Sequence, residues 1–199
     1  MTRTSQNLRM DDREVVQEIL RRHHAKTSLT GFLKYMMPRY KPAVFHHHMA
    51  SKLEAVVQGK IDRLMIFLPP RHGKSTMVSK GLPAYYFGHY PDREIITATY
   101  GADLSIGFGR AVRNMMADVR YENVFDDPTV TLSADSTAAN RFNTNHEGVY
   151  IAAGIGGPIT GRGAHLAVVD DVFKDRAEAS SPTHRKKVLD WYSSVLYTR

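Results

Sequence analysis

The fold is decided by the stretch Leu64-Met65-Ile66-Phe67-Leu68-Pro69-Pro70-Arg71-His72-Gly73-Lys74-Ser75-Thr76, in which an apolar run leads into a phosphate-loop pattern. The general pattern is G-x-x-x-x-G-K-[ST] at a turn from a strand into a helix. Gly73 lets the backbone approach a phosphate closely, because it has no Cβ. One element departs from the pattern, since Leu68 stands where the first glycine belongs. We expect a strand at 63–68, then a phosphate-binding loop, then a helix.

The residue types of this loop suit the phosphates of a nucleotide. Backbone amides of residues 72–76 can point at phosphate oxygens, at the positive end of the following helix. Lys74 can reach the terminal phosphates, and the Ser75 hydroxyl can hold Mg²⁺. The alternative is a cationic turn without a ligand. The sequence predicts ATP and Mg²⁺ as cofactors, with a loop made of Pro70, Arg71, His72, Gly73, Lys74, Ser75 and Thr76.

A second part of such a site is a strand that ends in a carboxylate. Residues 166–171 read Leu-Ala-Val-Val-Asp-Asp, and four apolar residues in a row are typical of a strand buried in a parallel sheet. We expect Asp170 to hold the water shell of Mg²⁺. Asp171 is the candidate to orient or deprotonate the attacking water, with Asp175 as the alternative. A strand that ends in a solvated Asp-Asp turn is the competing interpretation.

Composition narrows the classes of protein. The chain has 199 residues, 42% of them hydrophobic, which is typical of a globular domain. It has no Cys, which excludes disulfides, thiolate metal sites and Cys nucleophiles. Its net charge of +7 favours a polyanionic partner, although basic residues occur throughout. No apolar run is long enough for a membrane span, and the first residues lack the apolar core of a secretory signal.

Strands alternate with helices along the chain, which predicts an α/β fold with a mostly parallel sheet. We expect residues 1–40 to comprise an N-terminal tail and a helical, lid-like segment, and residues 41–199 to form a phosphate-loop ATPase domain. We expect the polypeptide to stop before the last strands of that domain. A helix is expected to begin at Asp11, and others are expected at about 29–37, 43–58, 102–117 and 182–197. The helix after the phosphate loop would have an apolar face of Met77, Val78, Leu82, Tyr85 and Tyr86. Expected strands lie at 63–68, 94–99 and 166–170, with short strands and turns over 128–153.

These phrases resemble the N-terminal ATPase domain of phage terminase large subunits, over roughly residues 30–199. The resemblance implies a phosphate-loop NTPase fold and ATP hydrolysis coupled to translocation of double-stranded DNA into a procapsid. It also implies a homo-oligomeric ring on the portal protein, a small terminase subunit as partner, a place in the host cytoplasm and no membrane. The nuclease domain that follows in the family is not part of this sequence. The phrases are Pro69-Pro70-Arg71-His72-Gly73-Lys74-Ser75, Phe108-Gly109-Arg110-Ala111-Val112-Arg113-Asn114, Gly154-Ile155-Gly156-Gly157-Pro158-Ile159-Thr160-Gly161-Arg162-Gly163-Ala164 and Val168-Val169-Asp170-Asp171.

The resemblance also assigns roles to residues outside the two motifs. Arg71 would stabilise charge on the γ-phosphate, and its alternative is a salt bridge to a neighbouring acid. Phe45 or His46 would contact the adenine base, and the alternative is a packed Phe beside exposed histidines. One of Arg110, Arg113 and Arg162 would reach the ATP of a neighbouring subunit or contact DNA.

Two other functions remain open at this point. The first is another DNA-dependent phosphate-loop ATPase, of the helicase or recombination type. The second is a truncated module that binds nucleotide with little turnover. The glycine-rich phrase at 154–164 favours the packaging motor over the first, and turnover with and without DNA separates it from the second.

Overall fold

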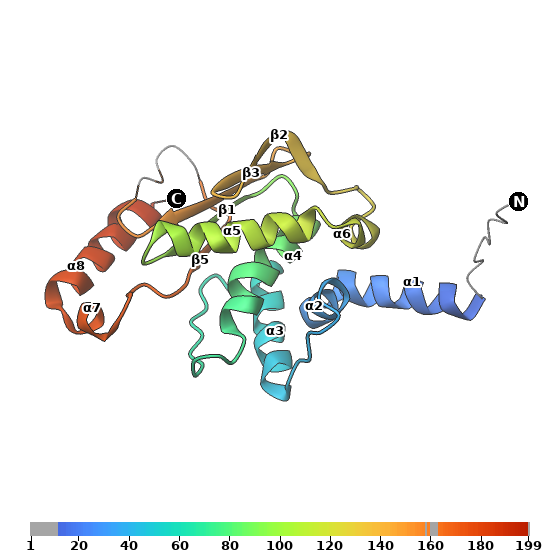
Figure 1. Ribbon diagram of the computed structural model, residues 1–199, viewed down its shortest axis with the longest axis horizontal. Coiled ribbons are helices and arrows are strands. Elements are labelled where there is room, and N and C mark those ends of the chain that lie inside the picture. The colour runs from blue at the N-terminus through green and yellow to red at the C-terminus, as the bar shows by residue number, and fades with distance from the viewer. Residues whose placement is uncertain (1–11, 158, 160–162, 199) are drawn as a thin grey trace, which may run out of the picture.

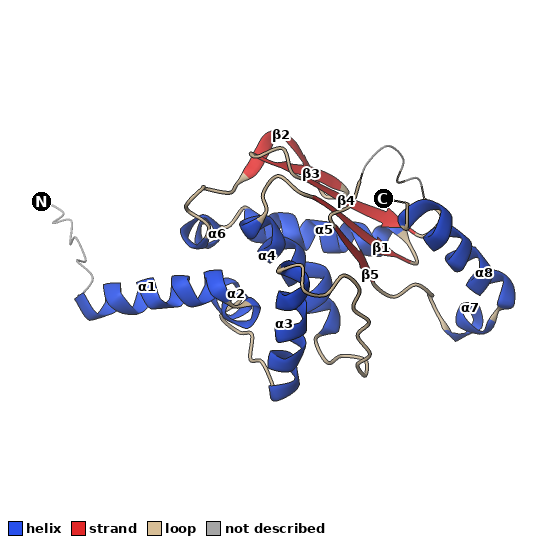
Figure 2. Ribbon diagram, turned by 180° about the vertical axis from the view of Figure 1, so that it is seen from behind, coloured by secondary structure: helices blue, strands red, loops and turns tan. Residues whose placement is uncertain are grey.

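The computed structural model describes residues 12–157, 159 and 163–198 of the chain (Figure 1). They form a mixed α/β fold in which helices flank a five-stranded sheet of order β2-β3-β4-β1-β5. Figure 2 shows this sheet between the helices that follow the phosphate loop and the C-terminal helices. The strands are β1 (Glu94–Thr99), β2 (Leu132–Ala138), β3 (Arg141–Thr144), β4 (Val149–Gly154) and β5 (Leu166–Val169).

The sheet is less parallel than we expected. β1 pairs in parallel with β4 on one side and with β5 on the other, whereas β2-β3 and β3-β4 are antiparallel pairs. The reason lies in the connections. Only residues 139–140 separate β2 from β3, and so short a turn can join only antiparallel strands. The connection from β1 to β4 runs through α5, α6 and the β2-β3 hairpin, and residues 155–165 connect β4 to β5. The carboxyl ends of the three parallel strands meet at one edge.

The helices begin and end where the sequence signals predict. The Ser28 side chain caps α2 by accepting a hydrogen bond from the Gly31 amide, and the Ser181 side chain caps α8 in the same way. Gly59, with a φ of 68°, follows the end of α3. The helical elements are α1 (Asp12–Thr27), α2 (Leu29–Met36), α3 (Val44–Val57), the π-helix η1 (Thr76–Gly81), α4 (Leu82–His89), α5 (Ala102–Met116), α6 (Val119–Val124), α7 (Arg176–Ser180), α8 (Pro182–Trp191) and the π-helix η2 (Tyr192–Leu196).

The two faces of the sheet pack against different helices. Ile95 belongs to the main core, which also contains Phe32 of α2 and Tyr85 of α4. The next residue, Ile96, points to the opposite face and packs in a smaller cluster with Trp191 of α8. This alternation is the normal consequence of strand geometry. Because helices cover both faces of the sheet, the carboxyl ends of β1, β4 and β5 lie between two layers of helices.

The predicted strand at 63–68 is wrong, because this segment is extended but pairs with no strand among the described residues. Leu64, Ile66 and Leu68 pack against the main core. The side chains between them, Met65 and Phe67, are 80% and 83% exposed. Buried and exposed side chains therefore alternate along this segment as they do in a strand. The backbone hydrogen bonds of a strand are missing from the described structure, because they need a neighbouring strand.

The helix after the phosphate loop begins at Lys74 and widens into η1 before it continues as α4. Pro83 stands just after this π-helical segment. Proline has no amide hydrogen, and its ring crowds the preceding turn, so a regular i to i−4 ladder cannot run through this position. Here the Leu82 amide instead bonds to the Met77 carbonyl, five residues back. The predicted apolar face of this helix, with Met77, Tyr85 and Tyr86, is buried.

Candidate nucleotide site

The loop that the sequence predicts to bind phosphate, residues 70–76, contains one glycine and leads directly into a helix. Gly73 has a φ of 77°, in the left-handed region that favours glycine. A Cβ at this position would also lie 2.8 Å from the Nε2 atom of His46. The helix starts at the next residue, Lys74, so its first amides have no partner within the helix. The loop thus presents free backbone donors at a helix N-terminus, which is a favourable place for an anion.

The structure brings the loop and the acidic strand end together. Asp170 follows β5, and its amide donates to the Ala98 carbonyl of the adjacent β1. Its side chain is buried, with the whole residue 4% exposed. The Nζ atom of Lys74 lies 2.8 Å from Asp170 Oδ1 and 3.5 Å from Asp171 Oδ1. Two motifs almost a hundred residues apart in the sequence therefore form one charged site.

Ser79 is a second partner of the Asp170 carboxylate, and the sequence did not predict this contact. Its hydroxyl is buried and donates to Asp170 Oδ2 at 2.7 Å. Ser79 lies four residues after Ser75, so both residues project from the same side of the helix. That spacing is the signal in the sequence that could have identified it. Asp170 is thus held by a lysine on one oxygen and a serine on the other.

The ion pair between Lys74 and Asp170 favours the charged form of each partner. Burial raises the pKa of Asp170, but hydrogen bonds from Lys74, Ser75 and Ser79 outweigh it and lower the pKa below its usual range. Burial lowers the pKa of Lys74, but the bond to Asp170 and the charges of Asp170 and Asp171 raise it overall. At neutral pH Lys74 and Asp170 therefore form a pair of opposite charges.

Asp171 differs from its neighbour in exposure and backbone. Its side chain is 53% exposed. Its φ of 46° is unusual for a residue with a Cβ, and its carbonyl accepts a hydrogen bond from Tyr100. The alternative acid, Asp175, caps α7 by accepting a hydrogen bond from the Glu178 amide at 3.0 Å. Of the two acids, Asp171 is the one that contacts Lys74.

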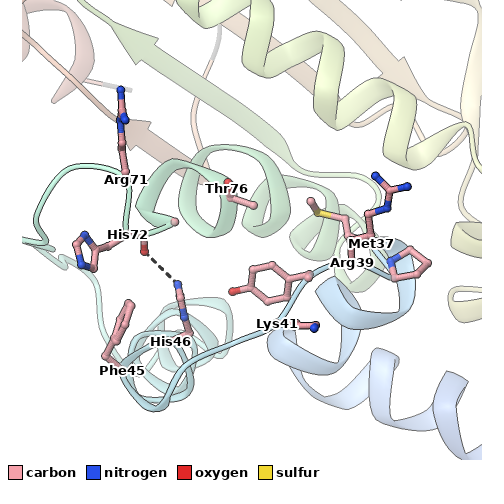
Figure 3. Close-up of a pocket in the computed structure, with 11 residues that line it drawn as sticks. Met37, Arg39, Lys41, Phe45, His46, Arg71, His72 and Thr76 are labelled. Carbon is pink, nitrogen blue, oxygen red and sulfur yellow. Dashed lines mark hydrogen bonds between the residues drawn. The ribbon is translucent and has the colours of Figure 1, made fainter.

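Arg71 is exposed and stands at a φ of 62°, so its backbone also adopts the left-handed conformation. Figure 3 shows its side chain extending away from Phe45 and His46. Within the described part of the chain, no ion pair links Arg71 to an acid, which was the alternative role that the sequence left open. Unusual backbone angles at residues of one site are a common feature of functional loops.

A pocket of about 740 Å³ adjoins the loop on the side of α3 (Figure 3). Phe45 forms one wall, and its ring lies 4.1 Å from the ring of His46, centre to centre. The Tyr40 hydroxyl is buried and has no hydrogen-bond partner among the described residues, and burial raises its pKa. Nothing in the sequence singled out Tyr40. The lining residues are Met37, Pro38, Arg39, Tyr40, Lys41, Phe45, His46, Arg71, His72, Gly73 and Thr76.

The remaining candidates lie away from the loop or outside the described residues. Arg110 is exposed on α5. Arg113, on the same helix, donates to the Thr137 carbonyl of β2 at 2.9 Å and to Asn114. Arg162 lies outside the described residues. Among the described residues, no group of three or more His, Cys, Asp or Glu side chains could hold a metal ion.

Comparisons with known proteins give one family and no individual relative. The family model described as "Terminase large subunit, T4likevirus-type, N-terminal" matches residues 65–199. Comparison with curated proteins and with solved structures finds no significant match. None of the helices in the described ranges has the length and apolar character needed to cross a membrane. Because the matched residues make up more than half of the sequence, and include both parts of the site, the chain belongs to the family of terminase large subunit N-terminal regions of the T4likevirus type.

Proposed function

We propose that this chain is the ATP-hydrolysing part of a phage DNA-packaging motor, with a phosphate-loop NTPase fold. Membership of the terminase large subunit family supports a role in packaging in general. The observation that carries the finer proposal is the 2.8 Å contact between Lys74 and Asp170. It joins a phosphate-binding loop to a buried carboxylate at the carboxyl end of a parallel strand, which is the arrangement that phosphoryl transfer uses.

The residues present fit ATP and Mg²⁺. The loop offers amides at a helix N-terminus, and Gly73 allows its left-handed backbone turn and the close approach of the His46 ring. Ser75 and Asp170 would hold the metal, because hard cations prefer hydroxyl and carboxylate oxygens. The absence of a cluster of three acids or histidines among the described residues agrees with this, since Mg²⁺ often takes only one or two protein ligands. When bound, Mg²⁺ neutralises the charge that develops on the phosphates.

Each residue of the proposed site would have a separate role in hydrolysis. Lys74 would turn from the carboxylates to the terminal phosphates. Asp171, which is exposed beside it, would orient or deprotonate the attacking water. Arg71, on the loop, would stabilise negative charge on the γ-phosphate in the transition state. In dilute solution these residues act alone, whereas Arg110, Arg113 or Arg162 of a neighbouring subunit would complete the site in a ring.

The partners follow from the family and from charge. Double-stranded DNA is a polyanion, and the net charge of +7 favours its binding. The portal protein and the small terminase subunit would be the protein partners, in the host cytoplasm. Translocation would couple hydrolysis in the ring to movement of DNA into a procapsid.

The test is equilibrium binding of a fluorescent ATP analogue in the presence of Mg²⁺. We expect Lys74→Ala to abolish binding, while Lys52→Ala, an exposed lysine on α3, leaves it unchanged. Far-ultraviolet circular dichroism checks that both variants stay folded. Unchanged binding by Lys74→Ala would show that the loop is not a nucleotide site.

A further inference from the structure

His46 lies between the start of α3 and the phosphate loop, and both of its ring nitrogens are engaged. Its Nδ1 accepts a hydrogen bond from the Ala43 amide at 2.9 Å. Its Nε2 lies 3.0 Å from the His72 carbonyl oxygen. A backbone amide can only donate, so Nδ1 carries no proton, and the proton of the neutral ring is on Nε2. His46 therefore donates from Nε2 to the carbonyl of His72.

We propose that His46 is a positioning residue that sets the conformation of the phosphate loop. This inference rests on the proposed nucleotide site and deepens it. It differs from the expectation that His46 contacts the base, because the ring has no polar atom left for a ligand.

The geometry of the peptide bond explains how His46, which bonds to the His72 carbonyl, also sets the direction of the Gly73 amide. The bond between His72 and Gly73 is trans, and in a trans peptide the carbonyl and the following amide point in opposite directions. His46 holds the His72 carbonyl toward α3. The Gly73 amide is consequently aimed away from α3, as a donor available to a phosphate. Loss of the bond would free this peptide plane to rotate.

Packing keeps the ring of His46 in place. The residue is only 8% exposed, and the rings of Phe45 and Tyr40 lie 4.1 Å and 5.9 Å from its own, centre to centre. On its far side the ring lies so close to Gly73 that even a methyl group there would collide with Nε2. The bond to Ala43 also occupies the first free amide of α3, as in one half of a capping box. The wall of the pocket and the phosphate loop are thus joined by one side chain.

The experiment compares Mg-ATP with inorganic tripolyphosphate, which has no base, by titration calorimetry. His46→Leu fills the space without hydrogen bonds, and we expect it to weaken binding of both ligands about tenfold, the effect of losing one buried hydrogen bond. His46→Gln keeps an acceptor and a donor and should restore most of the affinity. His47→Leu, an exposed position on the same helix, is the matched control.

The outcomes separate this inference from the proposed function. A loss confined to ATP would show that His46 reads the base, and an unchanged affinity in His46→Leu would show that it does not position the loop. Either result overturns the inference while Lys74→Ala still tests the nucleotide site. If the His46 variants do not fold, a measurement on the wild-type protein still tests the inference. Nitrogen NMR of the His46 ring should show a neutral ring protonated at Nε2, and a ring protonated at Nδ1 would refute the inference.

Discussion

The contact between Lys74 and Asp170 should be visible in the stability of the nucleotide-free protein. Lys74→Ala removes the cation that faces a buried carboxylate. Breaking a buried ion pair from one side costs about 3–5 kcal/mol. Here the cost is smaller, because the Lys74 side chain is 30% exposed and the Ser79 hydroxyl stays on the carboxylate. We expect a loss of about 1–2 kcal/mol in the free energy of unfolding at pH 7.

The loss should depend on pH in a defined direction. In the wild type the lowered pKa of Asp170 stabilises the fold above the unfolded pKa of about 3.9, and this contribution disappears as the pH falls through the folded pKa. In Lys74→Ala the burial that raises the pKa remains, while the lysine that lowers it is gone. Asp170 then takes up a proton at a higher pH than in the wild type. The deficit of the variant should therefore shrink as the pH falls from 7 toward 4.

Urea unfolding in EDTA measures this effect without a bound metal. With a slope of about 2 kcal/mol per molar urea, the expected loss moves the midpoint down by about 0.5–1 M. The double variant Lys74→Ala/Asp170→Asn supplies the control, because it removes the charge that is left uncompensated. It should be more stable than the sum of the two single changes predicts. Additivity within about 0.5 kcal/mol, or a deficit that grows at low pH, would refute the reasoning.

Three further predictions concern turnover and metal binding. Asp171→Asn should bind ATP like the wild type but hydrolyse it about a hundredfold more slowly in single-turnover assays, and a wild-type rate would move the role to Asp175. Ser79→Ala should raise the Mg²⁺ concentration needed for half-maximal nucleotide binding about fivefold, because Asp170 loses a hydrogen bond, and an unchanged Mg²⁺ titration would contradict this. ATP turnover should be slow and should rise with protein concentration in a dilute, monomeric sample, since an arginine from a neighbouring subunit contributes about 10³–10⁵ in rate. Fast turnover that is independent of concentration, in a sample shown to be monomeric by light scattering, would speak against a trans arginine.

Local sequence signals predicted the helices and the buried strand at 94–99 well. The strand at 166–170 also forms, as β5, but it lies at the edge of the sheet, so Ala167 and Val169 are exposed where a buried strand was expected. The strand at 94–99 depends on residues close in the sequence and is confirmed, and the starts of α2 and α8 are likewise fixed by the neighbouring side chains of Ser28 and Ser181. The left-handed backbone at Gly73 was predictable for the same reason, since it depends on the conformational freedom of glycine itself. That this loop binds phosphate stays a prediction. The family match then confirmed the resemblance that these phrases indicated.

The errors concern features that depend on distant partners. The apolar run at 63–68 has the pattern of a strand, but a strand also needs a neighbour, and the pattern does not show one. The hydrogen bond from Ser79 to Asp170 joins positions 91 residues apart. The bond from His46 to the His72 carbonyl likewise crosses from one element to another. The spacing of Ser75 and Ser79 places both residues on one side of the helix, but the partner that each contact reaches follows from the packing of the chain.

The ion pair gives a physical reason for a nucleotide site of this kind to require a divalent cation. To reach a phosphate, Lys74 has to leave Asp170, which is buried and depends on Lys74 to offset its desolvation. If a triphosphate bound alone, it would add negative charge beside a carboxylate that had just lost its counter-ion, and both effects oppose binding. In the proposed site, a divalent cation held by Ser75 and Asp170 would offset both penalties. Ser79 would support this arrangement, because its hydrogen bond to Asp170 does not depend on the lysine.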